Sequence, residues 1–157
     1  MTLTTLAIQT EACLQEELGA QRLLLSALER TEQAARAGAS AELEPCGREL
    51  EALVAQSAAR GARRRALLGK LGGALALRPE KVTLTRLSER LAAEQLDTAR
   101  LAALRTELRE VVARVVRVGR RLASVAAYHR GLMDELIQRL APAEAAGSGA
   151  LRVDAEA

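Results

Sequence analysis

The chain of 157 residues has almost no aromatic side chains, since Phe and Trp are absent and Tyr128 is the single tyrosine. β-branched residues are also few, with nine Val and two Ile. A β-sandwich or barrel normally fills its core with side chains of these two kinds. The composition therefore excludes an all-β fold.

Residues that bind zinc or form disulfides are scarce as well. There is one histidine, His129, and there are two cysteines, Cys13 and Cys46. A closed structural zinc site needs four Cys or His ligands, so one chain cannot build it, and we expect no cofactor. Two cysteines in a chain of this size are typical of reduced, buried side chains.

Long apolar segments are missing too. No uncharged apolar run approaches the ~20 residues that span a bilayer. The chain does not open with a basic segment followed by an apolar one, as a signal peptide would. We therefore expect a cytoplasmic protein without a membrane span.

The residues that are abundant favour helix. The sequence holds 33 Ala, 28 Leu, 21 Arg and 17 Glu, all of high helix propensity. The length is that of one ordinary domain. We predict a single all-α domain over residues 1–141, followed by a flexible tail over residues 142–157.

Apolar positions spaced by three and four predict two successive helices before residue 72. Gly38 is expected to stop the first, and Gly72 and Gly73 the second. The second begins either at Ser40 or near Glu44, where Pro45 would fall in the first turn.

A short connector helix and a very long last helix complete the predicted order. Thr83 can cap the connector, which carries Leu84, Leu87 and Leu91. From Asp97 to Leu140 the steps of three and four continue without a slip, as in the seam of a coiled coil. The seam consists of Leu101, Leu104, Leu108, Val111, Val115, Val118, Leu122, Val125, His129, Leu132 and Leu136.

Charge favours an antiparallel hairpin of the first two helices. Residues 1–59 contain four Arg and nine Glu, a net −5, whereas residues 60–81 carry seven basic residues and one acidic, a net +6. A fold-back near residue 40 places Glu11, Glu16 and Glu17 opposite the basic run of residues 60–65. In that register Cys13 and Cys46 lie far apart, which argues against a disulfide.

Laid back along the second helix, the last helix runs beyond its neighbours after about Arg130. An apolar helix end without a neighbour predicts a docking surface for an amphipathic helix of another protein. The alternative is that the connector helix or a second copy of the chain covers this end. The predicted binding residues are Leu122, Val125, Tyr128, His129, Leu132, Met133, Leu136, Ile137 and Leu140.

Two other functions compete with this hypothesis. His129 invites comparison with histidine phosphotransfer domains, but it falls on the seam without an acidic cluster or neighbouring lysine. The run of residues 60–65 would suit nucleic acid, but the chain lacks aromatic platforms for stacking. We therefore expect no catalysis and no nucleic-acid partner, and a structural coiled-coil adaptor or homo-oligomer remains open.

The order of these elements resembles the FlgN family of flagellar export chaperones. The resemblance is carried by the motif Arg64-x-x-Leu67-Leu68-x-x-Leu71-Gly72, the segment from Val82 to Leu87, and the very long last helix. It implies a cytoplasmic, non-enzymatic chaperone whose partners are flagellar hook-associated proteins and components of the export apparatus. It also implies that the C-terminal part of the chain binds the C-terminal helical segment of the client.

Overall fold

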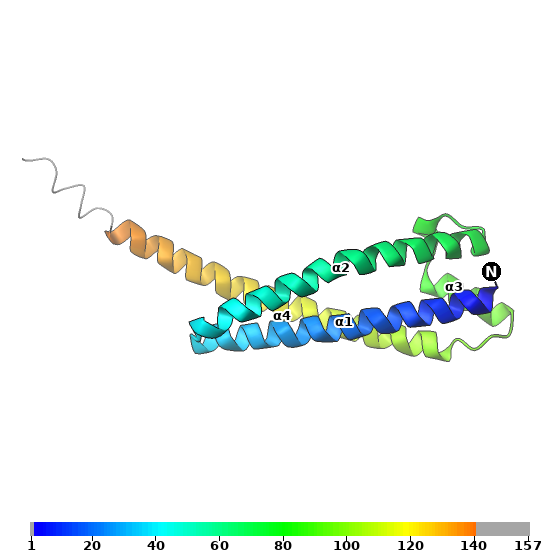
Figure 1. The fold of residues 1–157 in the computed structure, drawn as a ribbon, viewed down its shortest axis with the longest axis horizontal. Helices are drawn as coiled ribbons and strands as arrows, with labels where there is room; N and C mark the ends of the chain where they lie inside the picture. The colour runs from blue at the N-terminus through cyan, green and yellow to red at the C-terminus, as the bar shows by residue number, and fades with distance from the viewer. Residues whose placement is uncertain (1, 141–157) are drawn as a thin grey trace, which may run out of the picture.

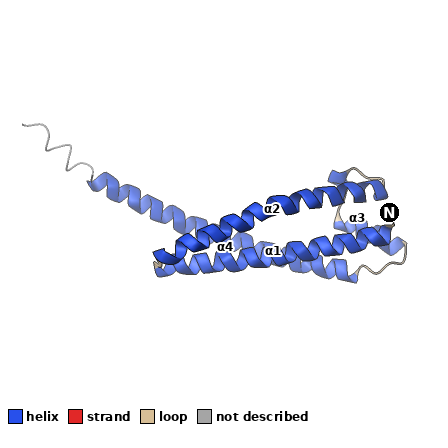
Figure 2. Cartoon of the chain, in the orientation of Figure 1, coloured by secondary structure: helices blue, strands red, loops and turns tan. Residues whose placement is uncertain are grey.

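The computed structural model describes residues 2–140, and regular structure in this range is entirely helical (Figure 2). The helices are α1 (Leu3–Ala37), α2 (Ser40–Leu75), α3 (Leu84–Ala93) and α4 (Ala99–Leu140), with a 3-10 turn, η1 (Pro79–Lys81), before α3. The predicted all-α fold of three long helices and a short connector is confirmed. The tail predicted at residues 142–157 lies outside the described residues.

Gly38 and Thr83 act as the predicted capping residues. Gly38 ends α1 in a left-handed conformation with φ 67°, which glycine adopts at little cost. α2 begins at Ser40, close to the first of the two predicted starts, but the expectation that Ser40 is the N-cap is wrong, because Ala39 takes that position and no side chain caps the helix. Thr83 caps α3 by accepting a hydrogen bond from the Arg86 amide, and Asp97 accepts one from the Ala99 amide at the start of α4.

The prediction that Gly72 and Gly73 end the second helix is wrong by a few residues. α2 continues to Leu75, and Ala76 takes up the left-handed cap with φ 53°. Gly72 is needed for another reason, because a Cβ atom there would lie 2.7 Å from the carbonyl oxygen of Leu77. The glycine lets the following loop turn back tightly over the helix.

α1 is the central helix and packs against both α2 and α4 (Figure 1). α4 runs parallel to α1. Four ion pairs join the two helices at sequence separations of 85 or 89 residues, so the partners advance together along both helices. These pairs are Glu11–Arg100, Arg22–Glu107, Glu29–Arg114 and Glu32–Arg121. The prediction that the last helix packs along the second is therefore wrong, since α4 packs mainly against α1.

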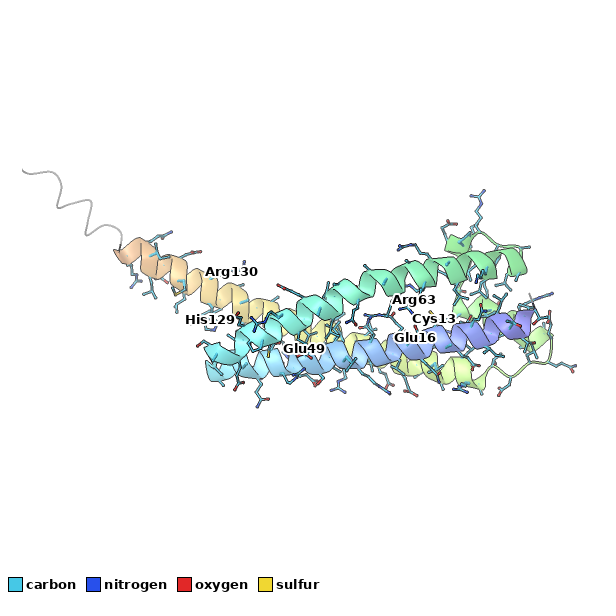
Figure 3. The ribbon with its side chains drawn as sticks, viewed as in Figure 1. Cys13, Glu16, Glu49, Arg63, His129 and Arg130 are labelled. Atoms are coloured by element: carbon cyan, nitrogen blue, oxygen red, sulfur yellow. The ribbon has the colours of Figure 1, made fainter. Side chains whose placement is uncertain are left out.

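The predicted antiparallel hairpin of α1 and α2 is present. A side-chain nitrogen of Arg63 lies 3.4 Å from a carboxylate oxygen of Glu16 (Figure 3), and a side-chain nitrogen of Arg60 lies 3.8 Å from a carboxylate oxygen of Glu17. Glu11 does not take part, because it pairs with Arg100 of α4 instead. Charge thus sets the register on both sides of α1.

A leucine core closes the end of the bundle opposite the α1–α2 turn. It contains fully or almost fully buried side chains from all four α-helices, namely Leu6, Leu71, Leu87, Leu91 and Leu101. Because α3 docks here, it does not cover the far end of α4. The alternative in which the connector helix shields that end is wrong for the described residues.

Both cysteines are free thiols, but they are half-buried and do not belong to the buried core that the sequence predicted for them. Burial raises the pKa of the Cys13 thiol, and the nearby carboxylates of Glu16 and Glu17 raise it further. The thiol therefore stays protonated at neutral pH and is a poor nucleophile.

Glu32 is expected to make the stability of the bundle depend on pH. This side chain is nearly buried and accepts two hydrogen bonds from Arg121, which lower the pKa of the Glu32 carboxyl. The folded pKa then lies below the unfolded pKa. The stabilisation is present above the usual glutamate pKa and is lost as pH falls through the folded value.

Glu32→Gln should therefore lower the thermal unfolding midpoint at about pH 7, and the difference from the wild type should shrink towards about pH 2. Circular dichroism melts at several pH values measure this. Glu29→Gln is the matched control, because the Glu29–Arg114 pair is exposed. A difference for Glu32→Gln that does not change with pH would contradict the linkage.

Candidate functional site

The heptad seam of α4 is buried over only part of its length. Its positions from Leu101 to Val125 are buried or half-buried against the bundle. From residue 126 to residue 139 every side chain is exposed, including the seam positions His129, Leu132 and Leu136. The pattern in the sequence therefore continues where the packing has stopped.

The cause is a difference in helix length at a fixed register. α1 ends at Ala37, and the separation of 85 to 89 residues places that end opposite residues 122–126 of α4. α2 turns back at the same level, at Ser40. Residues 127–140, here called the overhang, extend past the α1–α2 turn as the orange end of α4 in Figure 1.

The overhang carries two adjacent apolar stripes. Side chains three or four residues apart share a helix face, so Leu132 and Leu136 form one stripe and Met133 and Ile137 form the next. The exposed fraction ranges from 43% at Leu132 to 69% at Tyr128. Large exposed apolar side chains gathered in this way are typical of interaction surfaces.

The structure divides the predicted site residues into two groups. Leu122 and Val125 are half-buried and belong to the packed part of the seam. The exposed group on the overhang is Tyr128, His129, Leu132, Met133, Leu136 and Ile137. Leu140 is the last residue of α4, and its side chain lies outside the described part of the chain.

The polar groups of the overhang form no reactive arrangement. His129 lies edge-on to the Tyr128 ring, with centroids 5.9 Å apart, and is exposed together with Arg130 where α4 leaves the hairpin (Figure 3). Among the described residues no three His, Cys, Asp or Glu side chains gather into a possible metal site. Nothing in this geometry favours phosphotransfer through His129.

A second set of exposed apolar residues lies outside the predicted site. Val112 and Val116 of α4 lie one residue after seam positions, at the same spacing, and are 39% and 45% exposed. Val54 of α2 is 60% exposed. The signal in the sequence is a weaker apolar stripe that follows the seam of α4 by one residue.

A comparison with protein families bears on the functions considered above. A family model described as FlgN protein matches residues 1–150 of the chain. The chain belongs to the FlgN family. FlgN proteins are chaperones of flagellar export that act in flagellum assembly, a chaperone family rather than an enzyme family.

Two further comparisons add no relatives to the FlgN match. Neither the curated proteins nor the solved structures contain a match to this chain. Within the described residues, none of the helices is both long and apolar enough to cross a bilayer. The FlgN assignment therefore rests on the family model and agrees with the all-helical structure.

Because seam packing ends after Val125, the same substitution should have a large effect on stability at one seam position and almost none at another. Leu101→Ala removes a fully buried side chain and should lower the free energy of unfolding by about 2–5 kcal/mol. Leu136→Ala removes an exposed side chain and should change that free energy by less than about 0.5 kcal/mol. Urea unfolding followed by circular dichroism measures both, and a large loss for Leu136→Ala would show that the overhang is packed.

Proposed function

We propose that this FlgN-family protein is a cytoplasmic export chaperone that binds the C-terminal amphipathic helix of a hook-associated protein on its overhang. The observation that supports this is the continuation of the α4 seam, with a second apolar stripe beside it, past the end of α1 and α2. Bound in this way, the client helix is unavailable for assembly until it is released to the export apparatus.

The overhang suits an amphipathic helix because its two stripes form the apolar face of a two-helix contact. Leu132 and Met133 start the stripes, and Leu136 and Ile137 continue them one turn later. A client helix packing along this face would insert its own apolar side chains between them. This is the arrangement that α1 provides for the first half of α4.

The expected binding strength fits a chaperone that must release its client. Full burial of a large apolar side chain contributes about 1.5–3 kcal/mol, and the overhang exposes five such side chains that the structure describes, Tyr128 among them. Association and ordering of the client helix cost an estimated ~4–15 kcal/mol. The two free energies are of similar size, so we expect a complex that can dissociate.

The test is the double substitution Leu132→Asp and Leu136→Asp, measured as affinity for a hook-associated protein of the same organism by calorimetry. Two carboxylates in the contact should weaken binding at least ~100-fold, because each also removes a leucine contact. Helicity should be unchanged, since both side chains are exposed in the free chain.

Ile8→Asp with Leu23→Asp is the matched control. Both side chains are 62% exposed apolar residues of α1, outside the overhang, so this variant should bind the client like the wild type. Equal loss in both variants, or no loss in either, would contradict the proposal. Light scattering on the free chain checks the remaining alternative, since a stable dimer that Leu132→Asp and Leu136→Asp dissociates would indicate a homo-oligomeric adaptor instead.

A further inference from the structure

α3 occupies the place of a fourth helix at one end of the bundle. Its Leu84 lines an apolar cavity of about 180 Å³ together with Leu14 of α1 and Leu68 of α2. On its other side Thr85 accepts a hydrogen bond of 3.2 Å from Arg105 of α4. α3 thus lies over α1, between α2 and α4.

Beyond the start of α3, no helix of the described residues covers the corresponding face of α1 between α2 and α4. Each long helix carries a stripe, spaced by three and four, that begins beside α3 and runs on towards the α1–α2 turn. The stripes are Thr10, Leu14, Glu17, Gln21, Leu24 and Leu28 on α1, Leu68, Arg64, Gly61, Ser57, Val54 and Leu50 on α2, and Arg105, Leu108, Val112, Val116 and Gly119 on α4. We call the uncovered part, from Glu17 to Leu28 of α1 and the facing residues of α2 and α4, the valley.

The walls of the valley are poorly covered. Residues 54–59 of α2 are all exposed, and α2 arches away from α1 here (Figure 1). Among the described residues of α2 only Leu71 and Gly72 are buried, although the helix is 36 residues long. α2 packs against α1 and has no comparable contact with α4.

The rim of the valley is positively charged. Arg64 of α2 and Arg105 and Arg109 of α4 form no ion pair within the described residues. On the other edge of α4, Arg100, Arg114 and Arg121 each form an ion pair with a glutamate of α1. The valley side of α2 and α4 therefore carries three arginines without a carboxylate partner among the described residues.

We propose that the valley binds an acidic amphipathic helix of another protein, which completes a four-helix bundle in the middle of the molecule. The apolar stripes would receive its apolar face, and the rim arginines would meet its acidic flanks. The twelve residues from Glu17 to Leu28 correspond to about 18 Å, or three helical turns.

This docking site is separate from the overhang and does not rest on the proposed function. The test uses two synthetic peptides of 14 residues with the same leucine stripe, one flanked by Glu and the other by Lys. Because the chain has no tryptophan, Val112→Trp supplies a single fluorescent reporter in the valley. Leu23→Trp supplies the control, on the solvent side of α1.

The Glu peptide should shift the emission of Val112→Trp to shorter wavelength and leave that of Leu23→Trp unchanged. The Lys peptide should bind at least tenfold more weakly. Arg64→Glu with Arg109→Glu should weaken binding of the Glu peptide at least tenfold, whereas Arg78→Glu with Arg86→Glu, the same charge change at the α3 end, should not. If Val112→Trp lowers helicity, Val116→Trp replaces it.

Equal binding of the two peptides, or no change at Val112→Trp, would overturn the proposal. So would a single-stranded oligonucleotide that binds as tightly as the Glu peptide and gives the same shift, because the rim would then be a general anion site. Leu132→Asp with Leu136→Asp should leave the shift intact. A shift lost in that variant would place the peptide on the overhang and contradict the valley site.

Discussion

The structure depends on the parallel contact between α1 and α4, two helices of unequal length held in a fixed register. Four ion pairs repeat at separations of 85 or 89 residues, and the seam leucines and valines of α4 pack between them. Since the shorter helix ends in a glycine turn, the longer one must lose its neighbour at residue 126. The surface proposed to bind the client results from where α1 stops.

The same arrangement explains why the bundle is open along one side. With α1 in the centre, α2 and α4 lie on opposite flanks of it and have little contact with each other. α3 fills the space between them for ten residues only. The fold therefore buries a compact leucine core at one end and leaves apolar side chains accessible along the middle and at the free end.

Much of this fold could be predicted from the sequence, because local signals agree with the final structure. The seam of α4, the stop at Gly38, the cap at Thr83 and the pairing of Glu16 with Arg63 all follow from spacing, capping chemistry and charge. The overhang could be inferred as well, since it needs only the lengths of the helices.

The choice of neighbour for α4 could not be predicted in the same way. Both α1 and α2 offer apolar stripes of the same period, and a heptad pattern does not specify which stripe it meets. The extension of α2 past Gly72 depends on a loop that crosses that glycine, a tertiary contact without a local signal. Docking of α3 at the end far from the overhang likewise depends on the leucine core and not on the connector alone.

The central claim is that residues 127–139 lack a neighbour until a client helix binds. Hydrogen–deuterium exchange with mass spectrometry, on the full chain with and without a hook-associated protein, measures this directly. A helix segment of this length without tertiary support is marginal in water, so its amides should exchange fast in the free chain and slow markedly in the complex, while the amides around Leu101 stay protected in both. Strong protection of residues 127–139 in the free monomer, or no change on adding the client, would contradict the account.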